Sequence, residues 1–229
     1  MKVKFKSFQI IFWMFFCRSA FSQELLRGEV SVEMEPVYAQ FLGVPYPLDL
    51  TTANTWAVED AAAAFSGMVY GWTFVYEPGE RARDLQEFFD ITMLGKIETD
   101  DTRLKVTDAV MDGGVFYMYS DYILDETQKT RLLAWKSASK ATVKSLGFSS
   151  LQGDKGVTSR SQIKESALKD AMKTALRNRL RITERNRPRT VTGFISLSKF
   201  PIYRMQSGMW AATAEFRIEI KEIIPFAAY

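Results

Sequence analysis

The sequence contains no histidine and a single cysteine, Cys17, which lies in an apolar stretch near the N-terminus. Without an imidazole, a serine–histidine or cysteine–histidine nucleophile is excluded, and so is a zinc site with cysteine and histidine ligands. One cysteine cannot form a disulfide within the chain, so stability must come from a packed core. What remains is chemistry based on carboxylate, lysine or tyrosine side chains.

Motifs for nucleotide and calcium binding are also missing. The glycines at 113–114 belong to no phosphate-binding pattern such as G-x-x-x-x-G-K, and the acidic pairs at 100–101 and at Asp108 with Asp112 lack the D-x-[DN]-x-[DN]-G loop. No sequence spacing identifies the two carboxylates of a glycosidase. We interpret these residues as turn residues and predict a protein that is not an enzyme, with no catalytic residue, cofactor or metal site.

Residues 1–22 have the three parts of a secretory signal peptide. Three lysines among the first six residues precede an apolar run that ends at Cys17, and Ala20 and Ser22 are the small residues that signal peptidase requires. The run is shorter than the about 20 residues of a spanning helix. We expect cleavage after Ser22, no transmembrane span in the mature chain, and a location in the bacterial periplasm or at the cell surface. The alternative is lipid attachment at Cys17, although Phe16 is not the small residue that this processing favours.

Acidic and basic residues are segregated along the rest of the chain. Residues 23–126 hold 20 acidic and 6 basic side chains, whereas residues 127–189 hold 4 acidic and 16 basic ones. Charges separated on this scale either neutralise each other within the fold or attract an oppositely charged partner. Three interpretations follow: the two halves face each other in one molecule, they join copies head to tail in a homo-oligomer, or they bind an anionic envelope polymer or lipid head group.

Six arginines form a candidate contact for an anion or a protein partner. All occupy odd positions, so in an extended chain their guanidinium groups would project to one side: Arg177, Arg179, Arg181, Arg185, Arg187 and Arg189. Arginine binds phosphate and carboxylate groups bidentately. The alternative is an edge strand whose charges prevent aggregation. Nucleic acid is not an expected partner, because the chain has no RNA- or DNA-binding motif.

Hydrophobic periodicity predicts an α+β fold. Residues 23–55 are expected to form an extended arm with a short strand at 29–33, and residues 80–89 a short helix or turn. Helices are predicted at 56–71, 125–146 and 163–180. Strands are predicted at 72–76, 91–98, 103–110, 115–124, 181–185, 190–198, 201–206 and 210–223, with the glycines at 113–114 as a hairpin turn.

The order of these parts repeats, which predicts an internal duplication. Residues 56–124 and residues 163–229 each run from a helix through a strand to a glycine turn and a long aromatic strand. We expect two duplicated units, each a helix across a small antiparallel sheet, that share one interface. Residues 125–162 would form a connecting helix and a linker.

The second unit contains the helix S-A-L-K-D-A-M-K-T-A-L, followed by G-F-I and the strand W-A-A-T-A-E-F-R-I-E-I. This pattern, over residues 163–222, resembles the small secreted domain of flagellar accessory outer-membrane lipoproteins and the amino-terminal domain of the flagellar T-protein. The resemblance implies an assembly role in the envelope without catalysis. We therefore expect a protein that binds envelope or flagellar proteins, itself included; the alternative is a binding module for an anionic envelope glycan or lipid.

Overall fold

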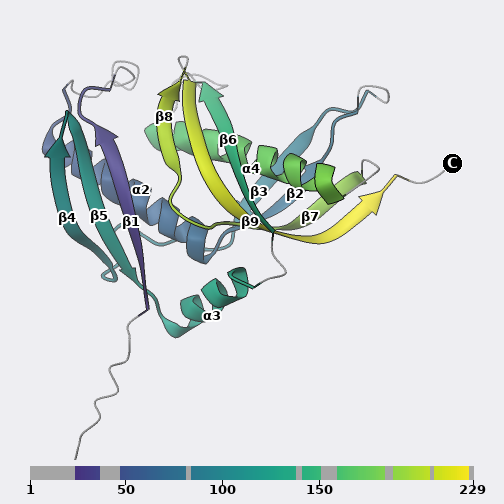
Figure 1. Ribbon diagram of the computed structural model, residues 1–229, viewed down its shortest axis with the longest axis horizontal. Coiled ribbons are helices and arrows are strands. Elements are labelled where there is room, and N and C mark those ends of the chain that lie inside the picture. The colour runs from purple at the N-terminus through teal and green to yellow at the C-terminus, as the bar shows by residue number, and fades with distance from the viewer. Residues whose placement is uncertain are drawn as a thin grey trace, which may run out of the picture.

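A computed structural model describes residues 24–36, 47–80, 84–137, 141–150, 159–183, 188–206 and 209–226. Within these residues, three α-helices and nine β-strands form two antiparallel sheets (Figure 1). The predicted α+β class is therefore confirmed. The predicted signal peptide lies outside the described residues. Among the helices that the structure describes, none combines the length and the apolar character that crossing a membrane would take.

The small sheet has three strands in the order β1 (Leu25–Glu33), β5 (Val115–Ile123) and β4 (Leu104–Asp112). Side chains alternate along β5, so that its even-numbered residues are buried and its odd-numbered ones face outward. The buried face lies against α2 (Leu50–Val69), which also contacts β1. Residues from the predicted N-terminal arm therefore complete this sheet, because β1 pairs with β5 over its whole length.

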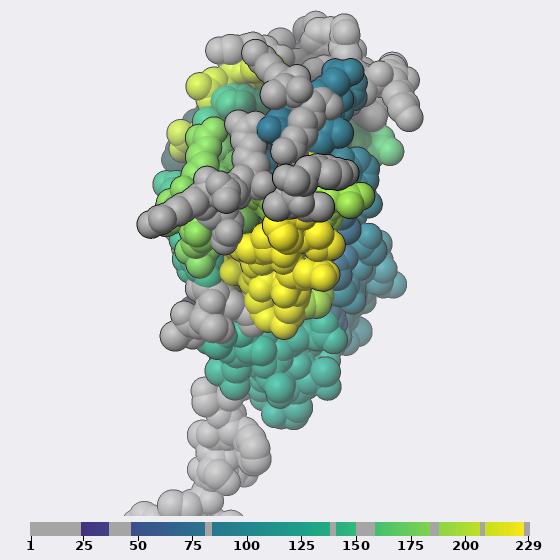
Figure 2. Space-filling model, turned by 90° about the vertical axis from the view of Figure 1, so that its right-hand side faces the viewer, coloured from purple at the N-terminus to yellow at the C-terminus, as the bar shows by residue number. Residues whose placement is uncertain are grey.

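The large sheet follows the order β3-β2-β7-β9-β6, with β8 pairing beside β9. Its strands are β2 (Trp72–Glu77), β3 (Phe88–Met93), β6 (Ala141–Ser150), β7 (Pro188–Leu197), β8 (Ile202–Gln206) and β9 (Met209–Pro225). Pairing between β6 and β9 stops at Ile218, so residues 219–225 pair with β7 alone. This end of β9 lies at the surface, in yellow in Figure 2.

Helix α4 (Arg160–Thr183) covers β6 and β9 at close range. A Cβ atom at Gly147 of β6 would overlap the backbone of Ala171 in α4, so only glycine allows this approach. The Ser145 hydroxyl donates to the Ala171 carbonyl oxygen at 2.7 Å. The small side chains of β6 are thus explained by the helix that packs on them.

Helix α2 lies between the two sheets and joins their cores. Asp49 caps its first turn by accepting the backbone N–H of Thr52 at 2.6 Å. Its alanines and Phe65 are buried, and it contacts β1 and β5 of the small sheet as well as β7 of the large sheet. A helix apolar on most of its circumference is expected in such a central position.

Several predicted elements were wrong. Residues 50–55 of the predicted extended arm belong to α2, and the strand predicted at 91–98 is β3, which begins at Phe88 and ends at Met93. The helix predicted at 125–146 stops at Trp135, the end of α3 (Glu126–Trp135), and residues 141–150 form β6. Lysines spaced by four suggested a helix there, but the small residues of β6 alternate with period two under α4. The strand predicted at 181–185 was also wrong over 181–183, since α4 continues to Thr183.

The predicted units do not form separate sheets. Each has the expected helix followed by a strand, α2 with β2 and α4 with β7, but β2 and β7 pair with each other in the large sheet. Residues 141–150, predicted as part of the connecting helix and linker over 125–162, add the edge strand β6 to the same sheet. The repeated helix–strand pairs therefore meet at the centre of one sheet.

Candidate functional site

Strand β4 forms an edge of the small sheet, outermost on the left in Figure 1. Its eight residues from Lys105 to Asp112 are all exposed, whereas its neighbour β5 buries four. Three large apolar side chains are nearly half exposed: Val106 at 48%, Val110 at 44% and Met111 at 48%. Among the described residues, β5 is the only strand that pairs with β4. The outer backbone groups of β4 are therefore available to another strand.

A β-bulge at Thr107 sets which face each β4 side chain occupies. The register shifts between Val106 and Asp108, so that residues on both sides of the bulge keep to one face. Val106, Ala109 and Met111 lie opposite buried residues of β5 and extend the inner face of the sheet past α2. The charged residues of β4 and Val110 share the outer face.

The β4–β5 hairpin closes with a tight glycine turn, as predicted. Gly113 has a φ of 53° and Gly114 a φ of 77°, the left-handed region that both central residues of such a turn occupy. A Cβ at either position would meet nothing within 4 Å. The backbone conformation alone therefore calls for glycine. Asp108 and Asp112 were predicted as turn residues, but Asp108 lies within β4 and Asp112 is its last residue, so that prediction was wrong.

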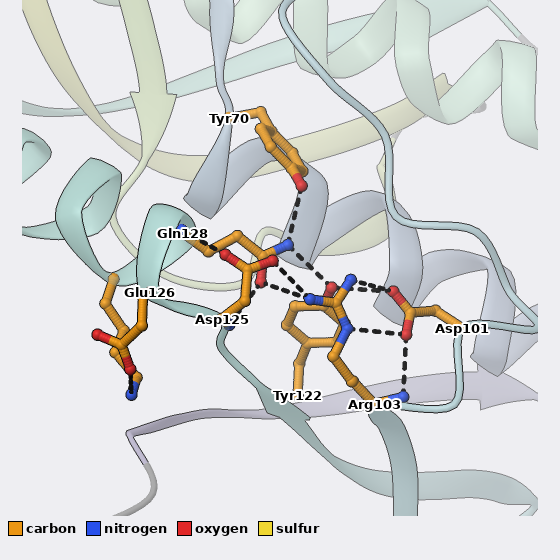
Figure 3. A network of polar contacts seen from close by, with 8 residues as sticks. Tyr70, Asp101, Arg103, Tyr122, Asp125, Glu126 and Gln128 are labelled. Atoms are coloured by element: carbon orange, nitrogen blue, oxygen red, sulfur yellow. Dashed lines mark hydrogen bonds and ion pairs between the residues drawn. The ribbon is translucent and has the colours of Figure 1, made fainter.

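At its other end, β4 is anchored by Arg103, which directly precedes it (Figure 3). The guanidinium donates to both carboxylate oxygens of Asp101, at 3.1 and 2.8 Å. It also donates to Asp125 Oδ2 at 2.7 Å and to Gln128 Oε1 at 3.2 Å. Asp125 and Gln128 form the capping box of α3, so one arginine joins the start of β4 to the start of this helix.

A second set of bonds continues this network into the core. The Tyr122 hydroxyl donates to Asp101 Oδ2 at 3.0 Å, and Gln128 Nε2 donates to the hydroxyls of Tyr122 at 3.0 Å and of Tyr70 at 2.8 Å. Tyr122 belongs to β5, and Tyr70 is the C-cap of α2. The base of the hairpin is therefore held by α2, α3 and β5 together.

The protonation states of this network are stable across the neutral range. Hydrogen bonds from Arg103 lower the pKa of Asp101 to about 2, and burial raises the pKa of Tyr122 to about 12. The pKa of Arg103 is raised by its bonds to Asp101. Because these three groups keep their charge states near neutral pH, the network suits the positioning of β4 better than acid–base catalysis.

The six candidate arginines do not form the expected row. Arg177, Arg179 and Arg181 belong to α4, where residues two apart point in nearly opposite directions. Arg177 donates from Nε to Glu87 Oε1 at 2.6 Å, which ties α4 to the segment before β3. Arg189 is exposed on β7. The remaining two, Arg185 and Arg187, lie outside the described residues.

Charges of the acidic and basic segments meet within one molecule. Lys164 and Arg160 of α4 both bind Asp60 of α2, Lys164 with Nζ 2.5 Å from Oδ2. Lys169 pairs with Asp90 at 3.2 Å. Together with the Arg177–Glu87 pair, these contacts match the first of the three interpretations of charge segregation. Head-to-tail contact between the segments is not needed to neutralise these charges.

Sequence reasoning missed the residues that hold this site together. The D-x-x-Q pattern at Asp125 and Gln128 is a capping-box signal that could have marked the start of α3. Nothing local could have shown that β4 lies at an edge, because strand order depends on pairing between distant residues. No group of three or more metal-ligating side chains occurs in the parts of the chain that the structure describes.

Comparisons with known proteins match most of the chain. A protein-family model matches residues 14–226, which include every described helix and strand. The chain is 24% identical to an uncharacterized protein of Treponema pallidum (strain Nichols) over 172 residues, which cover 75% of this chain and 69% of that protein. No solved structure matches the chain.

Proposed function

The chain belongs to the family whose model matches residues 14–226, and we propose that it is an exported, non-enzymatic protein of the cell envelope that assembles with copies of itself through β4. The observation that carries the proposal is the free, exposed edge of β4 with its apolar side chains. The signal-peptide pattern of residues 1–22 supports export, and the resemblance of residues 163–222 to flagellar accessory domains supports an assembly role.

An exposed strand edge is a template for strand addition. Most folded proteins shorten, cover or charge such an edge. Strand β4 carries three charged residues and a bulge, but it is nine residues long and leaves Val106, Val110 and Met111 in contact with water. A second strand along this edge would pair the free backbone groups and bury these side chains. The fixed base at Arg103 presents the strand in one position.

A second copy fits this edge in one antiparallel register. In this register, Ala109 lies opposite Ala109 of the second copy, and a two-fold axis relates the two bulges at Thr107. The two side chains of each opposed pair then lie on the same face of the combined sheet. Lys105 then lies opposite Asp112 of the second copy, and the same pair recurs at the other end. Asp108 lies opposite Val110 of the second copy, so no like charges face each other.

The apolar residues on the inner face follow the same register. Val106 lies opposite Met111 of the second copy, again twice by symmetry. Contacts between opposed apolar side chains stabilise strand pairs. The assembled sheet would have six strands, with both α2 helices on its inner side. Complementary charges and apolar pairs thus favour a second copy as the occupant.

The test is a charge swap measured by sedimentation equilibrium of the chain from residue 23. We expect a dimer that Asp112→Lys or Lys105→Asp weakens about tenfold or more, because each change sets two like-charge pairs across the edge. Combining the two changes restores opposite charges and should restore the dimer. Glu77→Lys, an exposed reversal in β2, is the matched control. A monomer at all concentrations, or a dimer insensitive to Asp112→Lys, would overturn the proposal.

A further inference from the structure

A cleft of about 560 Å³ opens between α2 and α4, away from β4. This volume lies in the range of small-molecule sites, which is about 300–1,000 Å³. Part of its lining is apolar and comes from both helices, the large sheet and the segment that follows β3. The apolar lining includes Trp72, Ile97, Leu168, Leu197 and Tyr203. The cleft can therefore accept the apolar body of a ligand.

One end of the cleft is closed by a buried ion cluster. Lys164 Nζ binds Asp60 and lies over the rings of Tyr203, at 4.7 Å, and Trp210, at 5.1 Å. Arg160 binds the same carboxylate and lies 4.6 Å over the ring of Trp56. The aromatic faces and Asp60 thus surround the Lys164 ammonium. This lysine acts as a wall of the cleft rather than as a free binding group for an anion.

The other charges of the cleft leave a surplus of carboxylate. Lys96 Nζ pairs with Glu98 Oε2 at 2.6 Å, which neutralises both. Glu59 of α2 and Glu165 of α4 also line the cleft, and among the described residues neither forms an ion pair. Both of these glutamates are exposed, so the unpaired charges that line the cleft are negative. A positive charge on a ligand would be attracted to them.

We propose that this cleft binds a monocationic amphiphile, a compound with one ammonium group on an apolar body. The apolar part contacts Met93, Leu168 and Pro201, and the ammonium lies between the exposed Glu59 and Glu165. An anionic amphiphile would bring its charge towards these two carboxylates, which disfavours it. The inference is independent of strand pairing at β4, because none of the cleft residues belongs to the small sheet.

The probes are octyltrimethylammonium, octanoate and octyl glucoside, each below its micelle concentration. Binding is followed by calorimetry and by the change in intrinsic tryptophan fluorescence. We expect saturable binding of the ammonium probe at least about tenfold tighter than that of octanoate, with octyl glucoside between them. Equal or tighter binding of octanoate, or no saturable binding of the ammonium probe, would overturn the proposal.

Variants locate the site. Glu59→Gln and Glu165→Gln should each weaken binding of the ammonium probe several-fold and leave the affinity for octyl glucoside unchanged. Glu126→Gln, at an exposed position of α3, is the matched control. Ala63 is exposed and lines the cleft, so Ala63→Phe should block all three probes. Ala63→Leu is a milder replacement if the larger side chain prevents folding. Ammonium binding that survives both replacements at Ala63 would place the ligand elsewhere and overturn the assignment.

Discussion

At the scale of single residues, Lys164 and Asp60 form an ion pair whose side chains are only 7% and 12% exposed. Burial lowers the pKa of Lys164 to about 8, although Asp60 opposes the shift. The pKa of Asp60 is lowered because two cations outweigh the effect of its own burial. The groups around the lysine are Asp60 of α2, Arg160 of α4, Glu33 of β1 and Tyr203 of β8. A buried cation of this kind should make stability depend on pH.

We expect the free energy of unfolding to rise between about pH 8 and pH 9, below the range in which the tyrosines of the unfolded chain lose their protons. In this range the folded protein releases the Lys164 proton while the unfolded chain, with an ordinary lysine pKa near 10.5, keeps it. The unfolded state then binds more protons, so stability increases with pH. Urea unfolding at several pH values measures the effect. Lys164→Met should remove the rise. A rise of unchanged size in this variant would show that Lys164 is not the group that releases the proton.

Replacing the carboxylate provides the contrasting variant. Lys164→Met leaves Asp60 paired with Arg160, one negative charge against one positive. Asp60→Asn removes the carboxylate that both buried cations bind, which should cost about 3–5 kcal/mol at pH 7. The same urea titrations compare both variants. If the two variants lose the same free energy of unfolding, Asp60 does not balance the charges of both Lys164 and Arg160.

At the scale of elements, the hairpin turn can be tested apart from the rest of the sheet. Gly114→Val places a β-branched residue at a φ of 77°, and we expect a loss of about 1–2 kcal/mol. No neighbouring atom lies within 4 Å of a Cβ there, so the cost belongs to the backbone. Gly113→Asn is the control, since asparagine tolerates the left-handed region. Urea unfolding in which Gly114→Val matches the parent chain would contradict this account.

The elements also show what local pattern can and cannot predict. Strands β2, β5 and β7 and the turn at 113–114 follow from alternation and turn residues, and they were found where expected. Strand β6 was mistaken for helix because Lys144 continues the four-residue spacing of Lys136 and Lys140. Ser145 and Gly147 are small because α4 packs on them. The α4 residues that pack on this strand lie about 26 positions later in the chain, so a local sequence pattern does not contain them.

The candidate site could be predicted only in part for the same reason. Lys105 and Asp112 and the alternating pattern of the strand between them are visible in the sequence. The position of β4 at the edge is not, because it depends on β5 pairing with β1 on one side and with β4 on the other. The contact between Asp60 and Lys164 joins residues 104 positions apart. Charge segregation indicated that the two segments attract each other, but it could not identify which residues meet.

At the scale of the whole molecule, α2 makes the two sheets depend on each other. Phe65 of α2 lies 5.6 Å from Tyr122 of the small sheet and 4.9 Å from Phe200, which follows β7, measured between ring centroids. One continuous set of buried residues extends from Val30 through α2 to Phe216. A core of this kind has no plane along which the molecule could separate into the two predicted units.

We therefore expect the protein to unfold in one cooperative transition. Urea curves from tryptophan fluorescence and from circular dichroism should coincide, and amide exchange should protect β5 and β7 to the same degree. A fragment of residues 163–229 would keep α4, β7 and β9 but lose β2 and β6, the strands on either side of the β7–β9 pair, as well as α2. It should remain unfolded. A folded fragment, or separate transitions for the two sheets, would restore the division into independent units.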